Sequence, residues 1–183
     1  MQNTPKGLRL QIGIFGRRNA GKSSLLNALA RQDVAIVSET PGTTADPVEK
    51  AMEMLPLGPV LLIDTAGLDD DAALIGGLRV EKSRKIFERA DIALIVSDAS
   101  WGAFEEKLLS DFAERGTAVI AVFNKTDVAF PPQNVLDSLR ERSVSFVMVS
   151  AGKGEGLGEL REMILRKAPE DFLSHSSPPS PIL

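Results

Sequence analysis

The sequence predicts an α/β fold in three layers, with a mostly parallel six-stranded sheet and helices on both faces. Apolar runs of strand length alternate with amphipathic stretches along almost the whole chain of 183 residues, which is the pattern of right-handed strand–helix–strand units. Several apolar runs are nearly continuous in Val, Ile and Leu, as is typical of strands buried on both faces of a sheet. The length suits one domain.

The elements follow one another in a regular order along the chain. Six short segments are candidate strands, at 8–15, 48–55, 60–63, 92–96, 118–123 and 144–149. Five amphipathic segments between or after them predict helices at 23–30, 78–89, 104–115, 133–142 and 157–167. In the last segment the apolar residues recur at helical spacing and give the helix one buried face.

The C-terminal segment has a different composition from the rest. From Ser174 to Pro181 the chain reads SHSSPPSP, in which seven of eight residues are Ser or Pro. Such a segment has nothing to bury and favours an extended linker. We therefore expect one domain over 1–170 and a linker over 171–183 that leads to a further domain, with His175 solvated in that linker.

Composition excludes several classes of function. The chain has 21 basic and 25 acidic residues, a formal net charge of −4 and no cysteine. Without cysteine it holds no disulfide and no cysteine-ligated zinc or iron–sulfur cluster. The slightly acidic balance argues against nucleic acid as its main partner. No apolar run is long enough to span a membrane, and a cytoplasmic location is expected.

A glycine-rich loop between the first strand and the first helix predicts a phosphate-binding site. The segment GRRNAGKS fits the pattern G-x-x-x-x-G-K-[ST], in which backbone N–H groups and a helix N-terminus hold a phosphate. Lys22 would place its charge on the β- and γ-phosphates, and the Ser23 hydroxyl would ligate Mg²⁺. The predicted nucleotide contacts are Gly16, Arg17, Arg18, Asn19, Ala20, Gly21, Lys22, Ser23 and Ser24.

A second motif, DTAG, follows the apolar run VLLI. Asp64 at the end of that strand is placed to hold Mg²⁺ through a water molecule. Gly67 allows its N–H to approach the γ-phosphate. An ordinary strand end and turn would explain DTAG alone, but the phosphate loop upstream favours the metal site.

Two further loops predict a guanine site. Asn124, Lys125 and Asp127 belong to the segment NKTD, which follows the apolar run AVIAVF. The Asp127 carboxylate accepts hydrogen bonds from N1–H and the 2-amino group of guanine, whereas adenine would leave it unpaired. Lys125 can cover the base, and Asn124 can join this loop to the phosphate loop. The segment 150–152, which is Ser150, Ala151 and Gly152, either presents an N–H to guanine O6 or is a generic polar loop.

The order of these motifs resembles the translation-factor-like branch of P-loop GTPases. The resemblance covers residues 8–168. It implies a three-layer P-loop NTPase fold, like that of small GTPases, and Mg²⁺-dependent hydrolysis of GTP to GDP and phosphate. It also implies switch loops at about 33–47 and 65–77 that respond to the γ-phosphate.

At two places the chain is similar to the potassium-activated GTPases, which include the tRNA-modification GTPase MnmE and ribosome-assembly relatives. Leu68 stands where many signalling GTPases have a water-positioning Gln, and Asn19 is combined with a segment PGTTAD at 41–46. The resemblance implies K⁺ ligands at Asn19, Ser38 and Thr40, the last two through backbone oxygens. It implies Mg²⁺ on Thr44, with Thr43 as the alternative. The alternative role for Asn19 is a loop-capping amide.

The catalytic residues implied by this likeness are Lys22, Asn19, Thr44 and Gly67. MnmE-like enzymes have a glutamate soon after DTAG that orients water, but residues 72–80 here contain no carboxylate. Whether Asp69, Asp70, Asp71 or Glu81 takes that role stays open. The expected intrinsic rate is slow.

The segment from Thr43 to Asp70 resembles the HydF family of iron–iron hydrogenase maturation GTPases, through DPVEKAMEMLPLGP and GLDD. That resemblance implies downstream dimerisation and iron–sulfur domains, a possible homodimer and other hydrogenase maturases as partners. The family's cluster ligands lie in the last of those domains, so no iron–sulfur cluster is expected in this chain. The module would act as a GTP-driven switch.

Two other interpretations remain. One is the G domain of a tRNA-modification or ribosome-assembly GTPase that acts on RNA. This interpretation needs a basic surface, and the candidate for it is a set of basic residues on the predicted helix 78–89: Arg79, Lys82, Arg84, Lys85 and Arg89. Glu81 and Glu88 lie among these residues, so a solvated helix face is their usual explanation. The other is a nucleotide-binding scaffold with negligible turnover.

Overall fold

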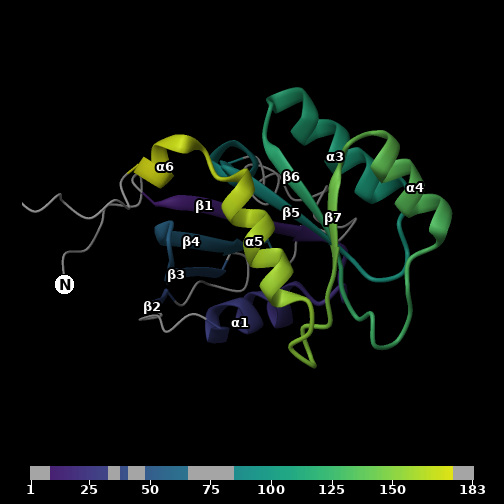
Figure 1. Cartoon of the computed structure of the whole chain (residues 1–183), viewed down its shortest axis with the longest axis horizontal. Helices are drawn as coiled ribbons and strands as arrows, with labels where there is room; N and C mark the ends of the chain where they lie inside the picture. The colour runs from purple at the N-terminus through teal and green to yellow at the C-terminus, as the bar shows by residue number, and fades with distance from the viewer. Residues whose placement is uncertain (1–8, 33–37, 41–47, 66–84, 175–183) are drawn as a thin grey trace, which may run out of the picture.

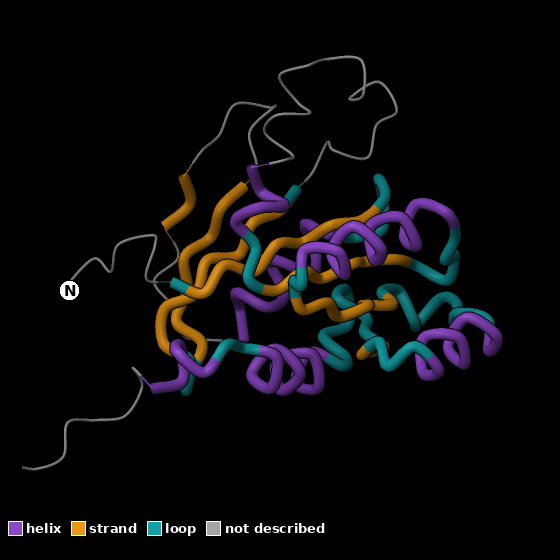
Figure 2. Tube along the Cα trace, turned by 90° about the horizontal axis from the view of Figure 1, so that it is seen from above, coloured by secondary structure: helices purple, strands orange, loops and turns teal. Residues whose placement is uncertain are grey.

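The computed structural model describes residues 9–32, 38–40, 48–65 and 85–174. Within these ranges a seven-stranded sheet has the order β2-β3-β4-β1-β5-β6-β7. Helices lie on both sides of the sheet (Figure 1; Figure 2). The predicted three-layer α/β fold is therefore confirmed.

All six predicted strands are present within one or two residues of their expected ends, the second and third of them forming a hairpin. They are β1 (Leu10–Gly16), β3 (Val48–Met54), β4 (Gly58–Asp64), β5 (Ile92–Ser97), β6 (Ala118–Phe123) and β7 (Ser145–Met148). Strand β1 pairs in parallel with β4 and β5, and β5, β6 and β7 continue in the same direction. The carboxyl ends of these five strands therefore meet at one edge of the sheet.

The expected number of strands was one too low. Strand β2 (Ser38–Thr40) pairs antiparallel with β3 and adds a seventh strand at the end of the sheet. Its sequence is Ser-Glu-Thr, so it has no apolar run for a periodicity argument to detect. It lies inside the segment 33–47 that was predicted as a switch loop.

The helices match the predicted amphipathic segments. They are α1 (Lys22–Gln32), α3 (Ala103–Arg115), α4 (Gln133–Glu141) and α5 (Leu157–Lys167). Residues 85–89 are also helical, and the rest of the predicted helix 78–89 lies outside the described residues. No helix in the described ranges is long and apolar enough to cross a membrane.

A short helix, α6 (Glu170–Ser174), was not expected. Residues 171–174 of the expected linker are therefore helical. Phe172 in this helix packs against the core. Residues 175–183 of that expected linker lie outside the described residues.

Two apolar layers fill the space between the sheet and its helices. Along β5, Ile92, Leu94 and Val96 face the layer covered by α1 and α5, whereas Ala93 and Ile95 face the layer under α3 and α4. This alternation follows from the two-residue period of a strand. Because both faces are covered, the sheet is rigid, and the loops at its carboxyl edge start from fixed positions.

Candidate nucleotide-binding site

The phosphate loop, residues 16–23, leaves the end of β1 and enters α1 at Lys22, one residue earlier than predicted. Gly21 has a φ of +92°, and a Cβ atom placed there would lie 2.2 Å from Nδ2 of Asn124. A side chain at this position would therefore face both backbone strain and a steric clash. Only glycine allows the loop to pass this close to Asn124.

Lys22 is buried at the start of α1, with its ammonium group turned back into the loop. Its Nζ donates to the carbonyl oxygen of Gly16 at 2.6 Å and to that of Arg17 at 2.8 Å. The loop thereby fixes a positive charge beside the N-terminus of a helix, where the aligned peptide dipoles also favour an anion. The contact of Lys22 with the β- and γ-phosphates stays a prediction.

The two predicted Mg²⁺ residues within the described ranges lie side by side. Ser23 at the start of α1 donates from its hydroxyl to Oδ2 of Asp64, at the end of β4, over 2.8 Å. A hydroxyl and a carboxylate are hard oxygen donors of the kind that Mg²⁺ prefers, with water and phosphate oxygens completing its shell. The pair therefore fits the expected metal. Thr43, Thr44 and Gly67 lie outside the described residues.

Asn124 joins the phosphate loop to the loop after β7. Its side chain is buried, and its Nδ2 donates to the carbonyl of Ala20 at 3.1 Å. Its Oδ1 accepts from the backbone N–H of Ala151 at 3.0 Å. The predicted link between the two loops is present, and it includes the segment 150–152 as well.

The other residues of the NKTD segment lie on the exposed side of this link. Lys125 donates from Nζ to the carbonyl oxygen of Asn19. Asp127 accepts at Oδ1 from the hydroxyl of Ser150 over 2.8 Å, and Ser150 itself is fully buried. One oxygen of the exposed Asp127 carboxylate is thus held by Ser150, and its recognition of guanine stays a prediction.

One more charge lies beside this group. The hydroxyl and the backbone N–H of Ser100 donate to Asp98, and these bonds, with the nearby charge of Lys125, hold the pKa of Asp98 below its ordinary value. Asp98 therefore stays ionised at neutral pH. It adds a fixed negative charge next to the lysine expected to cover the base.

The predicted K⁺ ligands are only partly described. Asn19 is exposed and has a φ of +65°, a left-handed conformation that asparagine tolerates better than most residues. Ser38 and Thr40 form the two ends of β2, opposite Ala51 and Glu49 of β3. The four carboxylates considered for orienting water, Asp69, Asp70, Asp71 and Glu81, lie outside the described residues.

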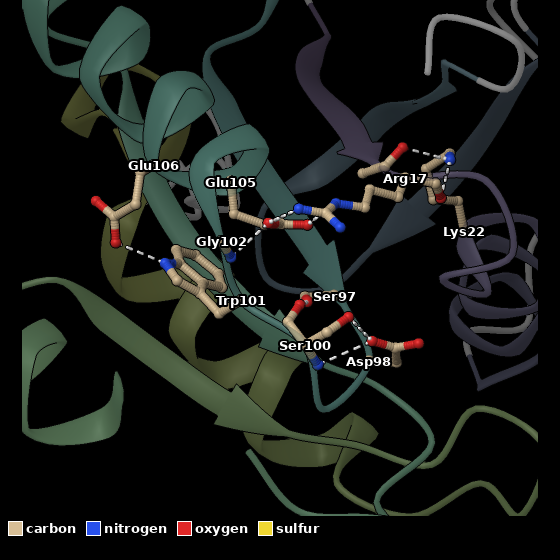
Figure 3. A network of polar contacts seen from close by, with 10 residues as sticks. Arg17, Lys22, Ser97, Asp98, Ser100, Trp101, Gly102, Glu105 and Glu106 are labelled. Carbon is tan, nitrogen blue, oxygen red and sulfur yellow. Dashed lines mark hydrogen bonds and ion pairs between the residues drawn. The ribbon is translucent and has the colours of Figure 1, made fainter. Parts of the chain in front are cut away.

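Besides Asp98, the sequence patterns missed a second residue near the site. Glu105 of α3 is buried and contacts the side chain of Arg17 in the phosphate loop (Figure 3). The available signal was the spacing of Gly102 and Glu105: the Glu105 carboxylate accepts from the backbone N–H of Gly102, the residue before α3 begins. That spacing predicts a helix start, but it does not predict a contact 88 residues away.

Comparison with known proteins agrees with this geometry. A family model described as 50S ribosome-binding GTPase matches residues 11–125. The tRNA modification GTPase MnmE of a Cyanothece species is 38% identical over 163 residues, which are 86% of this chain and 34% of that protein. MnmE of Heliobacterium modesticaldum is 42% identical over 84% of this chain and 33% of its own length. The chain thus spans about a third of these curated relatives.

Solved structures give the same result for the fold. A variant of Era from Aquifex aeolicus bound to GDP and AlF4⁻ is 31% identical, with a TM-score of 0.69 over 87% of this chain and 56% of that one. The G domain of the FeoB iron transporter from T. maritima is 25% identical, with a TM-score of 0.65 over 88% of this chain and 99% of its own.

Proposed function

Since this chain belongs to the 50S ribosome-binding GTPase family, we propose that it is a switch domain in which Mg²⁺ and K⁺ assist GTP hydrolysis. The observation that carries this proposal is the link through Asn124, which holds the phosphate loop and the NKTD loop at a fixed separation. Two loops held in this way can bind the two ends of one nucleotide.

The chemistry that the site supports is electrostatic. Phosphoryl transfer needs charge stabilisation and positioning, with little covalent participation by the protein. Lys22 supplies a fixed cation next to a helix N-terminus. Ser23 and Asp64 would hold Mg²⁺, which neutralises charge on the β- and γ-phosphates. Thr44 and Gly67 are proposed for the γ-phosphate side of the same site.

K⁺ stimulation is proposed from Asn19 and Leu68. A leucine has no group that orients water, so another source of transition-state charge is needed, and a cation held by Asn19 with the carbonyls of Ser38 and Thr40 supplies it. The exposure of Asn19 at the rim of the phosphate loop is compatible with this role.

The test compares GTP hydrolysis in KCl and in NaCl at equal ionic strength. The wild-type rate is expected to be at least about tenfold higher in KCl, and Asn19→Ala is expected to remove the difference. Asn134→Ala, on the exposed side of α4, is the matched control. Equal rates in both salts, with Asn19→Ala unaffected, would contradict K⁺ stimulation.

For the process that the switch controls, the curated relatives favour tRNA modification, because both reported relatives are named for it. Within a larger protein, the domain would then couple GTP hydrolysis to work on RNA. On the described part of the predicted basic helix, Arg89 pairs with Glu49 and donates to Gln11, so the charge of this arginine is already partly compensated within the protein.

Hydrogenase maturation is the second candidate, and the segment from Thr43 to Asp70 is the observation that favours it. In that case the proposed partners are dimerisation and iron–sulfur domains of the same protein, a second copy and other hydrogenase maturases. A deletion strain separates the candidates. If mass spectrometry shows that the strain lacks a modified tRNA nucleoside, tRNA modification is supported. If the strain loses hydrogenase activity while its tRNA is normal, hydrogenase maturation is supported.

A further inference from the structure

The side chain of Arg17 leaves the phosphate loop and pairs with Glu105 in the first turn of α3. Nε of Arg17 lies 2.9 Å from Oε1 of Glu105, and its second terminal nitrogen donates to Oε2 over 3.1 Å. The backbone N–H of Gly102 also donates to Oε2, at 2.8 Å. Figure 3 shows the guanidinium directed at this carboxylate.

The two partners differ in exposure. The Glu105 side chain is 1% exposed, whereas that of Arg17 is 47% exposed. A buried carboxylate is costly unless a cation and hydrogen bonds compensate it. Oε1 has no well-aligned hydrogen bond, so its compensation is the charge of Arg17. The requirement of Glu105 for a cation therefore restrains the arginine side chain.

The backbone of the same arginine touches the catalytic lysine. The carbonyl oxygen of Arg17 accepts from Nζ of Lys22 at 2.8 Å and from the backbone N–H of Ala20 at 3.2 Å. Arg17 is thus held by its side chain at α3 and by its carbonyl inside the phosphate loop. A shift of its side chain would move the oxygen that helps to orient Lys22.

We infer that Glu105 is a positioning residue for the nucleotide site: through Arg17 it holds the phosphate loop in the shape that places Lys22. The inference rests on the proposed binding of GTP to this loop. Glu105 itself is not expected to touch the nucleotide, because it acts on the loop through the arginine.

The next residue along α3 provides a matched control. Glu106 accepts from Nε1 of Trp101 at 2.7 Å and pairs with both terminal nitrogens of Arg142, at 2.7 and 2.9 Å. It is also a carboxylate bound to an arginine, but its contacts lead to the end of α4 and not to the phosphate loop. Glu105→Gln and Glu106→Gln therefore remove the same charge from neighbouring positions.

The experiment measures the affinity of the full chain for a fluorescent GTP analogue in Mg²⁺, at a temperature where circular dichroism shows each variant folded. Glu105→Gln is expected to weaken binding about tenfold, and Glu106→Gln less than about twofold. Failure of the wild type to bind would refute the proposed function instead. Equal effects of the two variants, or none from Glu105→Gln, would overturn the inference.

A double-mutant cycle separates positioning from general damage to the fold. If Glu105 acts through Arg17, then Glu105→Gln changes the nucleotide affinity little in an Arg17→Met background. If instead the double variant loses affinity by the product of the two single-variant losses, the two residues act independently, and the inference is overturned. Should Glu105→Gln not fold, Arg17→Lys replaces it, because lysine keeps a cation beside Glu105 but lacks the planar fork. The affinity of the Arg17→Lys variant for the GTP analogue is expected to fall about threefold, and an unchanged affinity would overturn the inference.

Discussion

Asn124 donates a hydrogen bond to the carbonyl oxygen of Ala20 across 104 residues of sequence, at 3.1 Å. The same amide accepts from Ala151 at 3.0 Å, so one buried side chain in the loop after β6 contacts the loops that follow β1 and β7. These loops start from different strands but are held together by Asn124. The separation between the phosphate and base ends of the site therefore depends on this residue.

Replacing this amide is expected to cost both stability and affinity. Asn124→Ala leaves the carbonyl of Ala20 and the N–H of Ala151 without their partner, which lowers the free energy of unfolding by about 1–3 kcal/mol. The affinities for GTP and for GDP should fall together, because both nucleotides need the same separation between the phosphate loop and the base loop. Urea unfolding and nucleotide titration measure the two effects, with Asn134→Ala as the exposed control. An unchanged unfolding free energy would contradict the buried link.

The Asp127 carboxylate predicts a change of base preference. In Asp127→Asn the amide oxygen still accepts from N1–H, but the amide NH₂ now faces the 2-amino group of guanine, donor against donor. Xanthine has an oxygen at that position and accepts the new hydrogen bond. The variant should lose GTP affinity by at least about a hundredfold and gain affinity for XTP.

Competition between GTP and XTP against a fluorescent nucleotide checks this change. Asp137→Asn on the exposed side of α4 serves as the control, and it should bind GTP as the wild type does. Retention of GTP preference by Asp127→Asn would show that another group recognises the base.

The contact between Ser23 and Asp64 at 2.8 Å predicts a metal-dependent effect. Ser23→Ala removes one oxygen ligand but leaves the backbone of the phosphate loop in place, so GTP affinity should fall by at least about tenfold in Mg²⁺. In EDTA the variant and the wild type should bind equally weakly. Ser110→Ala, on the exposed side of α3, gives the control, and a loss that persists in EDTA would assign Ser23 a structural role instead.

The fold could be predicted from the sequence because its strands are buried. The predicted strands from residue 60 onward are apolar runs, which burial on both faces of a sheet produces directly, whereas 8–15 and 48–55 alternate apolar with polar residues. Strand β2 was missed because Ser38–Thr40 is polar and pairs only at the end of the sheet. Helix α6 was missed because its five residues are too few to show a helical period.

The site was predictable wherever chemistry fixes residue type and spacing together. The phosphate loop and NKTD are local patterns, and parallel topology then brings their strand ends to one edge. The hydrogen bond from Ser150 to Asp127 and the pair of Arg17 with Glu105 join distant segments, and no local pattern specifies them. Such contacts depend on how the elements pack.

Asp91, just before β5, predicts a pH-dependent difference in stability. Partial burial raises the pKa of its carboxyl above 3.8, and the hydrogen bond from the backbone N–H of Gln11 opposes this only in part. The folded state therefore binds this proton more tightly than the unfolded state does. The group's contribution to stability is complete below pH 3.8 and is lost as the pH rises through the raised pKa.

Asp91→Asn carries no such charge, so its free energy of unfolding should exceed that of the wild type at pH 7, by less than about 1 kcal/mol because solvent still reaches the group. The difference should shrink as the pH falls toward 4, and urea unfolding at pH 7, 5.5 and about 4 measures it. A variant that is less stable at pH 7 would show that the bond from Gln11 outweighs the burial of the charge.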